Sequence, residues 1–206
     1  MSNEQMAPLE ERYFVYEQQT VPVDDFETSG YVLDVGGGGE GIIGILKGEQ
    51  VVAIDLRTSE LEEAPDGPLK LVMDARDMVF LDRTFHMATA FFSLMYFKSK
   101  PDHEQVFREV FRVLRPGGRF LVWDASISRP AETDKPSFVI LLRVAVKDQE
   151  IETGYGQPWP EETHDPAFYI ALAEKAGFQL AERKEDGRLF FLALRKPESP
   201  SPSRQL

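Results

Sequence analysis

Apolar and polar positions alternate along this chain in short blocks, and turns rich in glycine or proline separate the blocks. Uninterrupted apolar runs of this length are typical of buried parallel strands, which are covered on both faces. The first such run is Tyr31–Val35, which a series of glycines ends. Further runs predict strands over residues 51–55, 69–73, 85–96 and 119–123.

Helical patterns fall between several of these strands. Gly41–Leu46 predicts a short helix. A longer helix is predicted from Pro101 onward, because apolar residues recur there at helical spacing, and Arg115–Gly118 ends it. Its apolar stripe consists of Val106, Phe107, Val110, Phe111 and Leu114. Asp165–Ala176 predicts a third helix, which the following glycine ends.

The regular alternation stops after the fifth strand. Phe138–Val146 is a long β-prone run, Lys147–Gln149 is turn-like and Ile151–Tyr155 is extended again, which predicts an inserted hairpin. Phe178–Arg183 and Leu189–Leu194 predict a closing antiparallel pair of strands.

These elements predict an α/β fold with a doubly wound, Rossmann-like sheet of seven strands that is mostly parallel. The antiparallel pair closes the sheet, and the hairpin is inserted after the fifth strand. We expect an N-terminal extension or lid over residues 1–30 and the main domain over 31–196, with the insertion at 126–165. Residues 197–206 are rich in proline and serine and predict a disordered tail.

Composition limits the chemistry. A length of 206 residues suits a single domain. The chain has no cysteine, which excludes disulfides, thiolate metal sites and a cysteine nucleophile. Its three histidines lack metal-ligand spacing, so we expect no metal. No apolar run is long enough to cross a bilayer, and the first residues do not resemble a secretion signal, which favours a cytoplasmic protein without a membrane partner.

The chain is strongly acidic, with a formal net charge of −12. An acidic surface repels nucleic-acid backbones, so we expect no nucleic-acid partner. The arginines that could form a basic patch are Arg108, Arg112, Arg115 and Arg119. Most of them fall along one predicted helix and its end, where arginine is common on a solvated face.

The glycine-rich segment Val32–Gly41 carries the most information about function. Gly36, Gly38 and Gly41 satisfy the pattern G-x-G-x-x-G directly after a strand and before a helix. Glycines at such a turn permit positive φ angles and let a ligand approach backbone N–H groups. The pattern alone does not choose among nicotinamide, flavin and other nucleotide ligands.

Three successive strands each end in an aspartate, and these aspartates narrow the choice. Asp34 would repel a pyrophosphate but suits a ligand with a cationic amino group. Asp55 is placed to accept both hydroxyls of a ribose. Asp74 can accept from an exocyclic adenine amine, while Ala75 leaves room for the ring.

With these motifs in their order, the chain resembles the class I S-adenosylmethionine-dependent methyltransferases, in the branch that acts on small molecules. The resemblance covers residues 31–124. The segments that carry it are Val32–Gly41, Val52–Asp55, Met73–Ala75, Phe80–Asp82 with Phe85, Phe91–Phe97 and Phe111–Gly118. The chain departs from the family pattern at two positions. Glu40 stands where a glycine is usual, and His86 stands where an aspartate is usual.

The resemblance implies S-adenosylmethionine as cofactor and assigns roles to individual residues. Gly36, Gly37 and Gly38 would line its methionine end, with Asp34 near the amino group. Asp55 would hold the ribose and Leu56 would lie against the adenine. Asp74 and Ala75 would bind the adenine edge, and Phe92 or Ser93 would contact the cofactor from the fourth strand.

Methyl transfer from a sulfonium is an in-line displacement, in which the protein mainly aligns the reactants and excludes water. A general base is needed only if the acceptor must lose a proton. Tyr96 and Asp124 follow or end strands that face the acceptor, and we expect one of them to orient it. The alternative is that Tyr96 is a packed aromatic and Asp124 a solvated acid.

The fourth strand lacks the signature of enzymes that methylate exocyclic amines of nucleic acids, which favours a small-molecule acceptor, with a protein acceptor as the alternative. Residues 1–30 and the insertion are expected to form a lid over it, with an apolar wall of Tyr13, Phe14, Tyr155 and Trp159. The alternative is that the run Phe138–Val146 is the surface of a homodimer.

Two other functions stay open at this stage. One is a nicotinamide-dependent oxidoreductase, which Asp34 and the closing antiparallel pair disfavour. The other is a methyltransferase-like domain that binds a cofactor or a partner without catalysis, to which Glu40 and His86 point.

Overall fold

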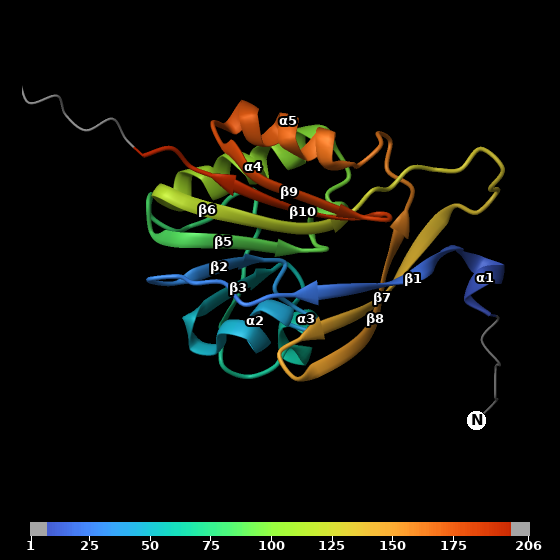
Figure 1. Ribbon diagram of the computed structural model, residues 1–206, viewed down its shortest axis with the longest axis horizontal. Helices are drawn as coiled ribbons and strands as arrows, with labels where there is room; N and C mark the ends of the chain where they lie inside the picture. The colour runs from blue at the N-terminus through green and yellow to red at the C-terminus, as the bar shows by residue number, and fades with distance from the viewer. Residues whose placement is uncertain (1–7, 199–206) are drawn as a thin grey trace, which may run out of the picture.

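A seven-stranded β-sheet forms the centre of the protein (Figure 1), and the computed structural model describes residues 8–198. From one edge to the other the strands are β4 (Leu69–Val72), β3 (Val51–Asp55), β2 (Val32–Val35), β5 (Phe85–Phe91), β6 (Leu114–Ala125), β10 (Leu189–Arg195) and β9 (Gln179–Asp186). The first five are parallel, and β10 is antiparallel to both β6 and β9. The predicted fold class is therefore confirmed, including the closing antiparallel pair.

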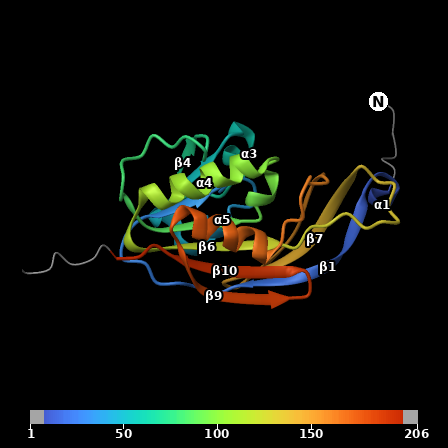
Figure 2. The same ribbon diagram turned by 90° about the horizontal axis from the view of Figure 1, so that it is seen from above.

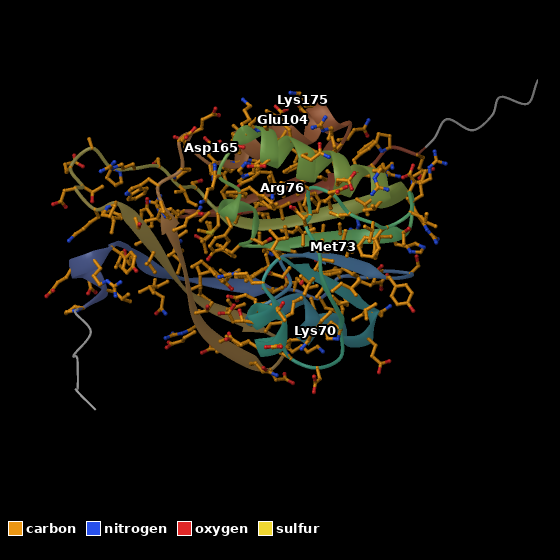
Figure 3. The ribbon with its side chains drawn as sticks, turned by 180° about the vertical axis from the view of Figure 1, so that it is seen from behind. Lys70, Met73, Arg76, Glu104, Asp165 and Lys175 are labelled. Atoms are coloured by element: carbon orange, nitrogen blue, oxygen red, sulfur yellow. The ribbon has the colours of Figure 1, made fainter. Side chains whose placement is uncertain are left out.

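Helices cover both faces of this sheet. α4 (Lys100–Val113) and α5 (Pro166–Ala176) pack on one face (Figure 1), and Glu104 of α4 forms an ion pair of 2.7 Å with Lys175 of α5 (Figure 3). α2 (Ile42–Lys47) and α3 (Thr58–Glu63) lie on the other face. Each face has its own apolar core, as expected for a doubly wound fold.

The fourth predicted strand is shorter than expected. β5 ends at Phe91, and Phe92 adopts a left-handed conformation with φ 48°. The Phe92 N–H still donates to the Trp123 carbonyl of β6 at 2.8 Å, and the left-handed conformation turns the chain out of the sheet directly after it. The short 3₁₀ helix η2 (Leu94–Tyr96) follows. The apolar run therefore continues beyond the strand because η2 is also buried.

A second, three-stranded sheet consists of β1 (Phe14–Val23), β7 (Ser137–Val146) and β8 (Gln149–Pro158). The pairing of β7 with β8 confirms the predicted hairpin. β1 pairs in parallel with β7, so the N-terminal extension becomes part of the same sheet as the insertion. Figure 1 shows β7 and β8 crossing one end of the large sheet, with β8 reaching toward α2 and α3.

The apolar side of β7 is buried inside the protein itself. Every second residue of the strand joins the core shared with α2, and these residues are Phe138, Ile140, Leu142, Val144 and Val146. The apolar run that suggested a dimer surface is thus accounted for by the fold of a single chain. A homodimer stays a prediction.

Several short elements were not foreseen: α1 (Leu9–Arg12), α3, and the 3₁₀ helix η1 (Gly48–Gln50). The predicted tail falls largely outside the described residues, as do the first seven residues of the N-terminal extension. Within residues 8–198 no helix combines the length and the apolar composition that a membrane span requires.

Candidate functional site

A cleft of about 610 Å³ lies at the carboxyl ends of β2, β3 and β5. This is the edge at which ligands bind in open α/β sheets. Most of the predicted site residues line it, namely Asp34, Gly36, Gly37, Gly38, Asp55, Leu56, Ala75, Phe92, Ser93 and Tyr96. Asp74 and Asp124 are not among the lining residues.

The glycine turn connects β2 to α2 along one wall of the cleft. Gly36 has φ 72°, and a Cβ atom there would lie 2.4 Å from the Ser93 Cβ, so the position requires glycine. The N–H groups of Gly36 and Gly37 donate to the Ile54 carbonyl at 2.8 and 3.2 Å. These two amides hold the ends of β2 and β3 together, so the expectation that a ligand approaches N–H groups of the turn does not apply to Gly36 and Gly37.

Asp34 is buried at the end of β2, with an exposed fraction of 3 %. The Thr89 hydroxyl donates to its Oδ1 atom at 2.7 Å. Burial raises the pKa of the Asp34 carboxyl to about 7; the Thr89 bond opposes this rise, and the nearby Asp55 carboxylate adds to it. A cationic group in the cleft would therefore stabilise the ionised form of Asp34.

Asp55 ends β3 and shapes the middle of the cleft. The Arg57 N–H donates to its Oδ1 atom at 2.9 Å. Leu56 follows with 57 % of its surface exposed, although it is a large apolar residue. This pair suits a ligand in which a flat ring is joined to a group with hydroxyls, because Leu56 can pack against the ring while Asp55 accepts from the hydroxyls.

Asp74 is not a lining residue of the cleft, and its predicted contact with the adenine edge stays a prediction. Both of its carboxylate oxygens accept from Arg76, and this pairing lowers the Asp74 pKa. Arg76 also forms an ion pair of 2.7 Å with Asp102, so Arg76 and Asp102 line the cleft in place of Asp74. Figure 3 shows Met73 and Arg76 on the segment after β4, with Arg76 nearer to α4. The prediction for Ala75 is not affected, because Ala75 lines the cleft.

Phe92 and Ser93 form the floor beside the glycine turn. The Ser93 hydroxyl donates to the Val35 carbonyl, which fixes the loop after β5 against the end of β2. The left-handed conformation of Phe92 is costly for a residue other than glycine, and such backbone conformations are concentrated at functional sites. Tyr96 extends the wall toward the open side, with an exposed fraction of 40 %.

Asp124 lies away from the cleft, which corrects the expectation that it faces an acceptor. β6 continues through Ala125, so the Asp124 side chain alternates to the face covered by α5. There it is fully buried, accepts from the Ala125 N–H at 2.8 Å and lies 3.5 Å from the Tyr169 hydroxyl. Burial raises its pKa to about 7, and those two contacts oppose the rise.

The hairpin forms the remaining wall through Gly154, Tyr155 and Gly156. Of the four predicted wall residues, only Tyr155 lines the cleft. Tyr13 is not a lining residue, and Phe14 and Trp159 pack against each other at 5.7 Å in the three-stranded sheet. β1 carries Phe14 to the opposite edge of that sheet from β8, because β7 lies between them.

The cleft has a charged rim that was not predicted from the sequence. It consists of Arg57, Glu60, Arg76, Lys98 and Asp102. Arg57 pairs with Glu60 at 3.1 Å, and Arg76 pairs with Asp102. Arg57 and Arg76 each come two residues after a strand-end aspartate and donate to it from their backbone N–H groups. This repeated Asp-x-Arg spacing is the feature of the sequence from which the two arginines of the rim could have been predicted.

Comparisons with known proteins agree with this geometry. Residues 33–122 match the model of the family described as "Methyltransferase domain". The sterol 4-C-methyltransferase strm-1 of Caenorhabditis elegans is 32% identical over 111 residues, which are 54% of this chain and 30% of that protein. The S-adenosyl-L-methionine-dependent Diels-Alderase iccD of Talaromyces variabilis is 34% identical over 101 residues, 46% of this chain and 33% of that protein.

Over residues 33–122 the chain is therefore similar to the methyltransferase domain family. The cofactor and the enzyme class inferred from the sequence are those of this family. The fold agrees as well, since the PH0226 protein of Pyrococcus horikoshii OT3 superposes with a TM-score of 0.59 at 24% identity, over 83% of each chain. The chain spans about a third of the length of the curated relatives it matches.

Proposed function

We propose that this chain transfers the methyl group of S-adenosylmethionine to a small molecule bound in the cleft. The observation that supports this most directly is the buried Asp34 carboxyl beside Asp55, at the ends of adjacent parallel strands. A pyrophosphate would be repelled there, whereas the ammonium and sulfonium groups of S-adenosylmethionine would be attracted. When bound, this cofactor supplies a methyl group that its sulfonium sulfur activates.

The lining residues fit the cofactor from one end to the other. We assign Asp34 to the amino group and Asp55 to the ribose hydroxyls. Leu56 and Ala75 flank the space for the adenine ring, and Phe92 and Ser93 support it from the end of β5.

The acceptor side of the cleft is aromatic, with Tyr96 and Tyr155 facing the same space. Partial burial raises the Tyr96 pKa, so its phenol stays neutral and orients an acceptor by hydrogen bonding. Arg57 and Arg76 are already paired with carboxylates, which disfavours an acceptor that carries a phosphate. A neutral or cationic small molecule suits the site better.

The hairpin is proposed as the cover of this acceptor side. Its base is closed by a bridge between Ile127 and His164, and β8 contributes three consecutive residues to the cleft wall. Because the chain spans only about a third of these relatives and their activities differ from one another, neither the acceptor nor the methylated atom is taken from any of them.

A turnover assay on a panel of small amines, alcohols, thiols and carbon acids tests the proposal. We expect S-adenosylhomocysteine to accumulate with at least one class and not without an acceptor. Binding of S-adenosylhomocysteine without turnover across the panel would favour a non-catalytic binding domain. Reduction of NAD with any of the alcohols would favour an oxidoreductase and contradict the proposal.

A further inference from the structure

The inner side of β8 is tied to the walls of the cleft by three side chains at alternating positions, Thr153, Tyr155 and Gln157. Thr153 and Tyr155 both donate to Glu40, and Gln157 donates to the Met95 carbonyl in η2. Residues at i, i+2 and i+4 of a strand point to the same face, so one side of β8 makes all of these contacts.

Glu40 is the residue of the glycine turn that departs from the family pattern. It lies between Gly39 and Gly41, whose φ angles are 59° and 55°. Its Oε1 atom accepts from Thr153 and its Oε2 atom accepts from Tyr155 at 2.9 Å. Both oxygens of one carboxylate therefore bind the hairpin, and hydrogen bonds to a charged group are stronger than neutral ones.

Tyr155 connects this contact to the floor of the cleft. Its ring stacks on Phe92 with centroids 5.5 Å apart and planes inclined by 14°. Burial, and then the charge of Glu40, raise the pKa of the Tyr155 phenol, so it remains a hydrogen-bond donor. The hairpin thus depends on the conformation of the glycine turn and of the residue at the end of β5.

We propose that Glu40 is a positioning residue that latches the β7–β8 hairpin to the glycine turn, so that cofactor binding at the turn and closure of the acceptor site are coupled. The identity of the cofactor in this statement rests on the proposed function, while the latch itself is a contact within the chain. Glu40 acts through Tyr155 and Thr153.

The coupling follows from the shared element. A ligand that fits the turn in its present conformation favours the state in which Glu40 reaches the hairpin. By linkage, loss of the latch must then weaken cofactor binding, and typical coupling energies correspond to about 5-fold or more in affinity. If Glu40 only stabilised the fold, replacing it would change the position of the hairpin by the same amount with and without ligand.

Spin-label distances test the latch directly, and the absence of native cysteine allows labels at chosen positions. Labels at Glu62→Cys on α3 and Glu150→Cys on β8 sit at exposed positions and measure the separation of the hairpin from the domain. Distances are recorded with and without S-adenosylhomocysteine in four labelled proteins. One is otherwise native, and the others carry Glu40→Ala, Glu40→Gln or the double substitution Thr153→Val/Tyr155→Phe. Glu152→Gln is the matched control, because Glu152 pairs with Arg143 on the neighbouring strand and does not reach the turn.

With Glu40 present we expect a narrow distance distribution that S-adenosylhomocysteine narrows further. Glu40→Ala and the double variant should broaden it and remove the response to ligand, and Glu40→Gln should be intermediate because it retains one acceptor oxygen. The control should behave as the native background does. An unchanged distribution in both Glu40→Ala and the double variant would overturn the latch.

The ligand response separates this idea from the proposed function. If S-adenosylhomocysteine binds and still narrows the distribution in Glu40→Ala, the coupling is wrong while the function stands. If it does not bind the native background, the proposed function fails, and the unliganded distributions still decide whether Glu40 holds the hairpin.

Discussion

At the scale of single residues, Asp34 illustrates how a residue of a binding site can lower the stability of the folded protein. A carboxyl group that is buried beside a second acid costs free energy when it ionises. The fold accepts this cost at the end of β2, where the neighbours are the Thr89 hydroxyl and Asp55. Such conflicts are expected where a ligand, absent from the free protein, supplies the missing opposite charge.

The pH dependence of stability should reveal this conflict. The Asp34 pKa is raised in the folded state from 3.8 to about 7, so its favourable contribution is complete below about pH 4 and is lost as the pH rises through 7. Asp34→Asn removes that loss. We expect the variant to gain about 4 kcal/mol relative to the native protein between pH 4 and pH 8, measured by urea unfolding.

Asp66→Asn is the matched control, since Asp66 is exposed and should leave the pH profile unchanged. Asp124 also makes the protein less stable as the pH rises, because burial raises its pKa. His164 has the opposite effect, because burial lowers its pKa to about 4. Both are present in all three proteins, so they cancel in the comparison. Parallel profiles for native protein and Asp34→Asn would argue against a strained Asp34.

Tyr96 allows a second prediction at this scale. Removing its hydroxyl in Tyr96→Phe should lower turnover about 10-fold, because a lost orienting hydrogen bond costs roughly 1–1.5 kcal/mol in the transition state. The affinity for S-adenosylhomocysteine should stay within about 2-fold, since the hydroxyl is assigned to the acceptor. Tyr31→Phe, at an exposed tyrosine outside the cleft, serves as control. Equal losses in turnover and affinity would place Tyr96 in the cofactor site instead.

Single residues also show what a sequence can and cannot reveal. Asp34 and Asp55 could be placed in the site because each ends a strand whose apolar run is unmistakable. Asp74 has the same signature, yet Arg76 two residues later binds its carboxylate. Glu40 was visible only as a departure from a pattern, since its partners lie 113 and 115 positions away in the chain.

At the scale of elements, local signals predicted α2, α4 and α5, whereas α1 and α3 were not foreseen. α5 begins with Asp165 as N-cap, whose side chain accepts from the Phe168 N–H at 2.8 Å, and ends at Gly177 in a left-handed conformation. Both residues are strong local signals for helix ends. The boundaries of α5 were therefore predictable from sequence alone.

The cap of α5 gives a prediction for stability without a change in function. Asp165→Ala should cost about 1 kcal/mol in the free energy of unfolding, because one helix N–H loses its partner. The affinity for S-adenosylhomocysteine should not change, since α5 does not line the cleft. Thermal unfolding and a binding titration on the same samples check both parts. Asp148→Ala in the exposed hairpin turn is the control, and a comparable loss there would contradict the role of the cap.

Strand β1 was missed for a physical reason. Its alternation is broken by an irregularity in register between Tyr16 and Gln19, and most of its residues are not buried. It exists as a strand because β7, more than a hundred residues later, offers an edge to pair with. Such non-local pairing overrides local propensity and leaves little trace in sequence.

At the scale of the whole molecule, a small group of polar contacts joins the three-stranded sheet to the large one, in addition to the apolar core that they share. The Arg188 guanidinium lies 3.8 Å from the centre of the Tyr16 ring and donates to the Ser126 carbonyl at 2.7 Å. The Tyr16 hydroxyl donates to the Ser128 carbonyl at 3.0 Å, and Gln19 bonds to the turn between β9 and β10. Figure 2 shows β1 next to the ends of β9 and β10.

Breaking this junction should destabilise the protein as a unit. Arg188→Ala loses the cation–π contact and the hydrogen bond to a carbonyl, and we expect a cost of about 1–3 kcal/mol in urea unfolding. Arg183→Ala, which loses only an exposed ion pair with Glu185, should cost less than about 0.5 kcal/mol. Similar values for the two variants would mean that the small sheet does not depend on this contact.

The central claim is that Asp34, Asp55 and the glycine turn form a site for an adenosyl group with a positively charged end. Calorimetric titration with S-adenosylmethionine and with NAD tests it most directly, in the native protein, Asp55→Asn and the control Asp82→Asn, whose carboxylate is exposed and paired with Arg112. We predict one site for S-adenosylmethionine, about 10-fold weaker binding in Asp55→Asn, native affinity in the control, and no uptake of NAD. Binding of NAD without binding of S-adenosylmethionine would contradict the account.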